Sequence, residues 1–115
     1  MVYDSDSFEW GNNEVLNIEL LSEYILPQEH KLLDAYPNPF NPTTLLSFEI
    51  SNNAHAKLDI YNINGQLVDT IIDGEYTAGY YSFNWNASKY SSGVYFVRLN
   101  INDKYHQTKK IILIK

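Results

Sequence analysis

The chain has 115 residues, no cysteine and a formal net charge of −6 at pH 7. Its length suits one domain with a modest core and a short extension. The lack of cysteine excludes disulfide bonds, thiolate metal sites and a cysteine nucleophile. The acidic balance disfavours nucleic-acid binding, which needs a basic surface. Ten Tyr, five Phe and two Trp are typical of a β-protein, because aromatic side chains pack well on pleated surfaces.

The N-terminal part of the chain differs from the rest in charge. Residues 1–36 hold eight acids and one lysine, whereas residues 37–115 hold six acids and seven bases. We expect residues 1–25 to be a linker or the tail of a preceding cargo domain. Alternating apolar residues favour one strand over 15–21, with a helix over 14–24 as the weaker alternative. The sequence shows no signal-peptide pattern and no long apolar run, so we expect neither a leader nor a membrane span.

A proline-rich stretch follows, with the sequence Pro37-Asn38-Pro39-Phe40-Asn41-Pro42. Each proline fixes its own φ and pushes the preceding residue into extended geometry. The stretch is therefore expected to be a stiff lead-in to a strand over 43–50. We expect the Asn side chains to bond nearby backbone and Phe40 to close one end of the core.

Short alternating runs predict strands over 31–35, 43–50, 55–62, 66–72, 79–85, 94–101 and 104–114. Asn64-Gly65 predicts a type I′ hairpin turn, Asp73-Gly74 is expected to end a strand, and Asn102-Asp103 predicts a second tight turn. The apolar run 111–114 predicts a last strand covered on both faces. Seven strands without a helix predict an all-β fold, an immunoglobulin-like antiparallel β-sandwich of Greek-key type.

Five motifs then occur in a fixed order: "LPQEHKLLDAYPNPFNPTTLLSFEI", "LDIYNINGQLV", "AGYYSFNW", "SSGVYFVRL" and "KKIILIK". Together they resemble the type A C-terminal sorting domain of the type IX secretion system of Bacteroidetes and related bacteria. The resemblance covers about 26–115. The chain departs from the family's pattern at 86–90, where its loop is shorter than usual. The resemblance does not extend to residues 1–25.

The resemblance implies a non-catalytic sorting signal for an upstream cargo domain in the same chain. Its implied partners are the outer-membrane translocon and the C-terminal signal peptidase. Its implied route runs through the periplasm to the cell surface or the medium, often with cleavage and surface attachment. No cofactor, nucleic-acid partner or direct membrane insertion is expected.

The residues that match the family's motifs are candidates for the sorting signal. They are Pro37, Asn38, Pro39, Phe40, Asn41, Pro42, Asn64, Gly65, Gly93, Tyr95, Arg98, Lys109, Lys110 and Lys115. One hypothesis is that the three lysines form a basic edge of the last strand beside Arg98. The alternative is a solvated strand edge, because lysines commonly guard such edges against pairing.

Other functions have less support in the sequence. A carbohydrate-binding module would use Tyr80, Tyr81, Trp85 and Tyr90 as stacking surfaces, and a purely structural immunoglobulin-like spacer is a further alternative. An enzyme is not expected, because His30, His55 and His106 are scattered and no triad is apparent. Asp69, Asp73 and Glu75 are too few for a calcium site, which takes six or more oxygens.

Overall fold

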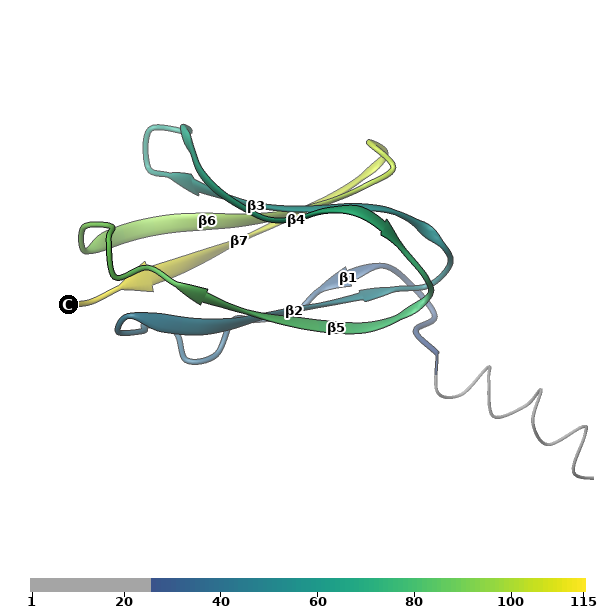
Figure 1. The fold of residues 1–115 in the computed structure, drawn as a ribbon, viewed down its shortest axis with the longest axis horizontal. Helices are drawn as coiled ribbons and strands as arrows, with labels where there is room; N and C mark the ends of the chain where they lie inside the picture. The colour runs from purple at the N-terminus through teal and green to yellow at the C-terminus, as the bar shows by residue number, and fades with distance from the viewer. Residues whose placement is uncertain (1–25) are drawn as a thin grey trace, which may run out of the picture.

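Two antiparallel sheets pack face to face in the computed structural model, which describes residues 26–115 (Figure 1). The part of the chain described contains strands and connecting turns and no helix. The strands are β1 (Lys31–Leu32), β2 (Thr43–Ile50), β3 (Ala54–Asn62), β4 (Leu67–Tyr76), β5 (Gly79–Asn86), β6 (Gly93–Ile101) and β7 (Tyr105–Leu113). The strand expected over 15–21 lies outside the described residues.

The strand order confirms the predicted immunoglobulin-like sandwich. One sheet has the order β1-β2-β5 and the other has the order β4-β3-β6-β7. The β3–β4 and β6–β7 connections are hairpins within a sheet, whereas the β2–β3, β4–β5 and β5–β6 connections cross between the sheets. This crossing pattern is the Greek-key arrangement of immunoglobulin-like sandwiches.

The core lies between the sheets and follows the period-2 alternation of the sequence. In β2 the buried positions include Leu46, Phe48 and Ile50, each no more than 1% exposed. The facing sheet contributes further alternate residues to the same cluster, namely Ala56, Leu58, Ile60, Tyr95, Val97, Leu99 and Ile101. Burying one large aliphatic or aromatic side chain contributes about 1.5–3 kcal/mol. Alternation therefore both defines these strands and drives the two sheets together.

Strand β4 runs further than predicted. Asp73 and Gly74 were expected to end it, but they pair with Lys57 and Ala56 of β3. The register of this pair shifts between Leu58 and Asp59 and again between Ile60 and Tyr61. Such bulges bend and twist a strand without ending its ladder. The Asp-Gly pair is consequently tolerated inside an edge strand.

The type I′ turn lies in the other hairpin. Asn102 and Asp103 have φ values of 55° and 57°, and the N–H of Lys104 bonds the carbonyl of Ile101 at 3.0 Å. A type I′ turn needs positive φ at both of its central residues, as Asn102 and Asp103 have. The prediction of a type I′ turn at Asn64-Gly65 is therefore wrong.

The β3–β4 connection is longer, with residues 63–66 between the two strands. Gly65 alone in this turn has a positive φ, of 80°, and its N–H bonds the carbonyl of Asn62 at 2.9 Å. The Asn62 side-chain oxygen also accepts bonds from the N–H groups of Asn64 and Gln66. This Asx-type turn reverses the direction of the chain between β3 and β4, as a type I′ turn would have done.

Strand β7 forms one edge of the four-stranded sheet and buries only its inner face. Ile111 and Leu113 are no more than 1% exposed, whereas Ile112 is half-buried and Ile114 is 52% exposed. Coverage on both faces was predicted and is wrong, because the outer face of this sheet carries no further layer. No helix capable of crossing a membrane occurs within residues 26–115.

Candidate functional site

Four separate segments meet at one end of the sandwich, which we call the motif end. The β1–β2 loop, the β3–β4 turn, the β5–β6 loop and the C-terminus all lie there (Figure 1). They contain the proline-rich stretch 37–42, the Asn64-Gly65 pair, Gly93 at the start of β6, and Lys115. Antiparallel pairing brings these segments together, since alternate connections of such sheets fall at the same end. Motifs far apart in sequence thus share one surface.

Asn38 attaches the proline-rich stretch to the last strand. Its side-chain amide donates to the carbonyl of Lys110 at 3.1 Å and accepts from the N–H of Ile112 at 3.0 Å. Phe40 continues the contact, because its N–H bonds Ile112 and its carbonyl accepts from Ile114, both at 2.9 Å. The expectation that Asn38 bonds nearby backbone is wrong, since its partners lie more than 70 residues away. The stretch instead pairs with the free edge of β7.

The other residues of the stretch fix the loop to the three-stranded sheet. The hydroxyl of Thr44 donates to the carbonyl of Pro37 at 2.7 Å, and the N–H of Ala87 donates to the carbonyl of Pro42 at 2.9 Å. The peptide bonds that precede Pro37, Pro39 and Pro42 are all cis. Asn41 is exposed at the tip of the loop.

Phe40 closes the end of the core as expected. It is 2% exposed, and its ring lies 5.8 Å from the ring of Trp85. Trp85 is equally buried and donates its indole N–H to Asp69 at 2.9 Å. Tyr95 packs against the same indole and donates its hydroxyl to the carbonyl of Ser91 at 2.6 Å. This last bond is the tyrosine corner typical of immunoglobulin-like sandwiches, in which a Tyr near the start of the sixth strand holds the preceding loop.

The aromatic residues considered for sugar stacking do not form one surface. Trp85 is buried, Tyr81 stacks on Phe48 in the core, and Tyr90 packs against Trp85. Tyr80 is 57% exposed. A sugar ring needs an accessible aromatic face, so this set is better explained as core packing.

A polar hollow lies at the motif end between the β3–β4 turn and the β5–β6 loop. Its volume is about 480 Å³, and its lining includes Asn64, Lys89, Ser91, Ser92 and Gly93. The C-terminal residue lies next to it. The backbone N–H of Lys115 bonds the Ser92 hydroxyl at 3.0 Å, and its amine donates to the carbonyl of Ser88 at 2.5 Å. Hydroxyl, amide and amine groups therefore converge beside the chain terminus.

The three lysines of the C-terminal motif do not form one basic edge. Lys109 points toward the other sheet and pairs with Asp34 at 2.8 Å, which lowers the pKa of that carboxyl. Lys110 lies on the outer face, directly opposite Phe96 in the sheet. Lys115 lies at the motif end. Because successive strand residues alternate between faces, Lys109 and Lys110 cannot share one, and only Lys110 lies on the face that carries Arg98.

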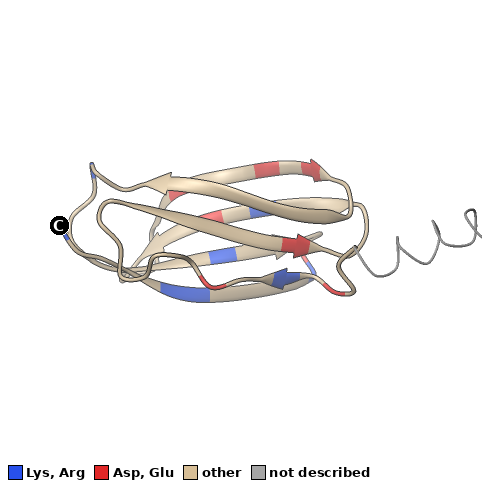
Figure 2. Cartoon of the chain, turned by 90° about the horizontal axis from the view of Figure 1, so that it is seen from below, with Lys and Arg blue, Asp and Glu red and all other residues tan. Residues whose placement is uncertain are grey.

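Charge over the described part of the chain is balanced. Residues 26–115 hold eight acids and eight bases. Figure 2 shows the two kinds interspersed along the strands. No strand is basic throughout, so recognition of a general basic surface has little support in this arrangement.

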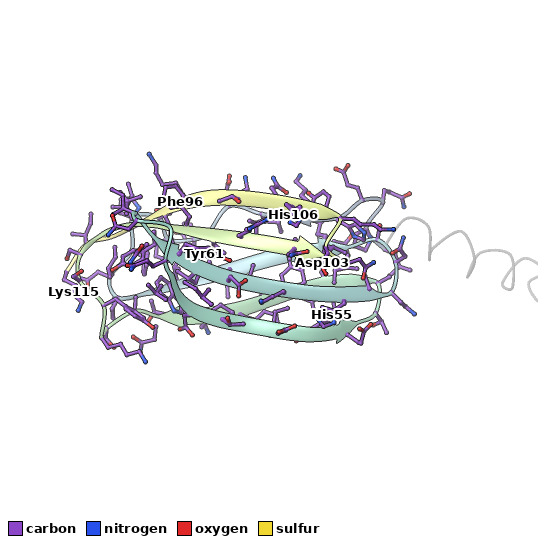
Figure 3. The ribbon with its side chains drawn as sticks, turned by 90° about the horizontal axis from the view of Figure 1, so that it is seen from above. His55, Tyr61, Phe96, Asp103, His106 and Lys115 are labelled. Atoms are coloured by element: carbon purple, nitrogen blue, oxygen red, sulfur yellow. The ribbon has the colours of Figure 1, made fainter. Side chains whose placement is uncertain are left out.

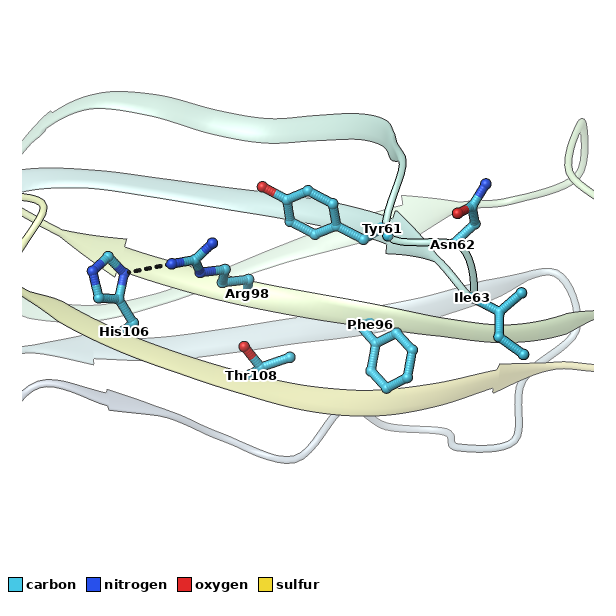
Figure 4. A pocket seen from close by; sticks show the side chains of 8 residues that line it. Tyr61, Asn62, Ile63, Phe96, Arg98, His106 and Thr108 are labelled. Atoms are coloured by element: carbon cyan, nitrogen blue, oxygen red, sulfur yellow. Dashed lines mark hydrogen bonds between the residues drawn. The ribbon is translucent and has the colours of Figure 1, made fainter.

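Tyr61, Phe96 and His106 lie on the outer face of the four-stranded sheet (Figure 3). Arg98 lies among them in a shallow groove (Figure 4). The groove has a volume of about 430 Å³. Its lining includes Tyr61, Ile63, Phe96, Arg98, His106 and Thr108. The Arg98 guanidinium donates to Nδ1 of His106 at 3.1 Å. Sequence reasoning missed the apolar part of this groove, although the alternation of 94–101 already placed Phe96 on the same face as Arg98.

The acids considered for calcium diverge in space. Asp69 points inward to Trp85, whereas Asp73 and Glu75 both bond the ring of His55, at 2.6 Å and 3.0 Å. The hydrogen bond to Asp73, and secondarily that to Glu75, raises the pKa of this exposed imidazole. Within residues 26–115 no group of three His, Asp or Glu side chains is placed to hold a metal ion.

Comparison with solved structures supports the fold. A crystal structure of dimeric latent PorU from Porphyromonas gingivalis matches with a TM-score of 0.59 and 17% identity, over 72% of this chain. The matched region spans only 9% of the PorU chain. CopC from Methylosinus trichosporium OB3b matches with a TM-score of 0.42 and 15% identity, over 74% of this chain and 91% of its own. At 17% identity the likeness to PorU concerns the fold alone.

Comparison with protein families is more specific. The model described as "Secretion system C-terminal sorting domain" matches residues 34–115, which is most of the chain. A search of the curated proteins found no significant match. The matched range contains every element of the motif end and extends to Lys115. The chain therefore belongs to the family of secretion system C-terminal sorting domains, and this membership implies a sorting signal for type IX secretion.

Proposed function

We propose that this domain is a non-catalytic signal that directs an upstream cargo domain of the same chain across the outer membrane. In this proposal the cargo reaches the type IX translocon through the periplasm. A C-terminal signal peptidase then removes the domain, and the cargo is attached to the cell surface or released to the medium. Neither nucleic acid nor insertion into the membrane takes part. Family membership itself implies only the coarser outcome, export to the cell surface or the extracellular space.

The observation that carries the proposal is the convergence of the family's motifs at the motif end. Structural motifs of a sandwich need only stabilise their own strands, whereas here Asn38, Asn64 and Gly93 also lie around one terminus. A partner docking at that end would contact residues from all four segments at once. Such a surface exists only in the folded domain, which supports recognition of shape rather than of a linear peptide.

A secretion assay in a bacterium that has type IX secretion tests the proposal. A fluorescent reporter behind a signal peptide is fused to residues 1–115, and the reporter is quantified in the periplasm, on the surface and in the medium. The intact fusion is expected to leave the cell. The Lys110→Gln/Lys115→Gln variant is expected to accumulate in the periplasm, because it removes two charges at and next to the motif end.

The matched control is Lys31→Gln/Lys104→Gln, which removes two equally exposed charges elsewhere. It is expected to be exported like the intact fusion. Equal export of both double variants would exclude a role for the two lysines. Retention of the intact fusion in the periplasm would contradict the proposed function as a whole.

A further inference from the structure

The groove on the outer sheet face combines an apolar floor with a cationic end. Across the sheet, Tyr61 lies opposite Phe96, and Phe96 lies opposite Lys110. Ile63 adds a side chain that is 72% exposed. In the neighbouring row, Arg98 lies between Asp59 and Thr108. Aromatic, aliphatic and basic groups thus share one surface, as Figure 4 shows.

Arg98 is the chemically unusual member of this surface. No carboxylate of residues 26–115 lies within ion-pair distance of it. Asp59 is its neighbour on β3 but is only 4% exposed, and its oxygens accept bonds from the hydroxyls of Thr70 and Tyr61. Among residues 26–115 the guanidinium makes one hydrogen bond, to Nδ1 of His106. An arginine with several donors left over is suited to bind a carboxylate in a bidentate manner.

The chain contains a segment with the complementary pattern. Residues 1–25 hold six acids and no basic residue. Within them Asp4, Asp6, Phe8 and Trp10 recur at every second position, so an extended chain would present all four on one face. Two acids followed by two aromatics on one face match a groove that is cationic at one end and apolar at the other.

The spacing of the two patterns also agrees. Asp6 and Phe8 are two residues apart, as are Arg98 and Phe96 on β6, and two strand residues span about 7 Å. A carboxylate on Arg98 would therefore place the next aromatic of the same face over Phe96 and Tyr61. Trp10 would then reach Ile63 at the far end of the groove.

The connecting chain is long enough to allow this contact within one molecule. Trp10, the last residue placed in the groove, is sixteen residues from Leu26, a span that reaches up to about 53 Å, whereas a nine-residue strand such as β6 spans about 30 Å. The described chain begins at the end of the sandwich where the β6–β7 turn lies (Figure 1). Tethering of this kind gives an effective concentration of the order of millimolar, so even a weak contact is populated.

We propose that the segment Asp4–Glu14 docks into this groove in its own molecule. The Asp6 carboxylate binds the Arg98 guanidinium, and Phe8 and Trp10 cover Tyr61, Phe96 and Ile63. The path by which the upstream sequence leaves the domain is thereby set along the outer face of the four-stranded sheet. This inference stands apart from the sorting role, because it concerns contacts on the outer sheet face, and the groove meets the motif end only at the β3–β4 turn.

Tryptophan provides a direct test, because the chain has only Trp10 and Trp85. The full chain labelled with 5-fluorotryptophan gives two ¹⁹F resonances, and Trp10→Phe identifies the one from the segment. We expect the Trp10 resonance to be shifted from its position in a free peptide of residues 1–14. Arg98→Gln and Asp6→Asn should each return it to the free position, and the double variant should have no further effect.

The Trp85 resonance reports the core and must stay unchanged for a variant to count as folded. Lys104→Gln is the control for charge alone, since Lys104 lies in the β6–β7 turn, and it should leave the Trp10 shift in place. A Trp10 resonance at the free position in the unaltered chain would overturn the proposal. A shift that disappears on dilution would also overturn it, because the segment would then bind a second copy.

Discussion

Asn38 shows how one side chain can join two motifs that are separated by most of the domain. Its amide has a donor and an acceptor in the same plane, which matches the alternating carbonyl and N–H groups along a strand edge. It therefore binds β7 as a neighbouring strand would. No local rule predicts this, since an Asn between two prolines is expected to bond its own loop.

Replacing Asn38 by alanine should loosen the end of β7. The carbonyl of Lys110 and the N–H of Ile112 would lose their partners, at a cost of about 1–2 kcal/mol in the free energy of unfolding. Amide hydrogen exchange at Ile112 and Ile114 should become faster. The matched control is Asn41→Ala, because Asn41 lies in the same loop and its side chain makes no hydrogen bond within residues 26–115. Equal exchange rates in the two variants would show that Asn38 does not hold the strand.

Asp59 shows that a side chain on the outer face of a sheet can still be buried. Asp59 and Arg98 lie side by side on the outer face of the sheet, yet Asp59 is 4% exposed because Thr70, Tyr61 and Lys57 cover it. Burial of an outward side chain depends on the neighbours across the sheet. Those neighbours are fixed by register and by the β4 bulge, which periodicity in one strand does not reveal.

At the scale of elements, the strand bounds were predicted closely from the sequence, whereas the turn types were predicted less well. Alternation placed β2, β3, β5 and β6 within one or two residues of their observed bounds. The tight turn predicted at Asn102-Asp103 is confirmed, whereas the type I′ geometry was predicted at Asn64-Gly65 and is found at Asn102-Asp103 instead. Asn-Gly favours a type I′ turn when two residues connect the strands, whereas residues 63–66 separate β3 from β4 and the Asn62 side chain bonds the N–H groups of Asn64 and Gln66.

The φ values in the two turns predict opposite effects on stability for a substitution that introduces glycine and one that removes it. Asp103→Gly should stabilise the protein by up to about 1 kcal/mol, because Asp103 has a left-handed φ of 57° that glycine adopts without strain. Gly65→Ala should destabilise it by about 1 kcal/mol, because alanine is strained at the φ of 80° found there. Urea denaturation of both variants measures the two changes. If Gly65→Ala proved neutral, the left-handed geometry of this turn would be contradicted.

At the scale of the whole molecule, β7 has two roles that experiments need to separate. It contributes Ile111 and Leu113 to the core, and it leads directly into Lys115 at the motif end. Removing the C-terminal residues therefore tests the fold and the sorting signal at the same time.

Truncation after Thr108 should abolish cooperative unfolding or shift it to much lower denaturant. Loss of one buried aliphatic side chain alone costs about 2–5 kcal/mol, and the truncation removes two together with the Asn38 contacts. Lys110→Gln/Lys115→Gln should stay within about 0.5 kcal/mol of the unaltered chain, as exposed substitutions usually do. Urea denaturation followed by circular dichroism compares them. A truncated chain with an unchanged transition would show that β7 is dispensable for the fold.

The sequence by itself determined the class of the fold, the number of strands, the inward residues of most strands and the family. These depend on alternation, turn composition and motif order, which are local or linear properties. Only the tertiary structure showed that Asn38 binds β7, that Lys109 and Lys110 face opposite ways, and that four motifs meet at one end. The same holds for the groove, in which Tyr61, Phe96 and His106 come from three strands. Contacts between distant segments depend on register, bulges and sheet crossing, and these are fixed only when the whole chain packs.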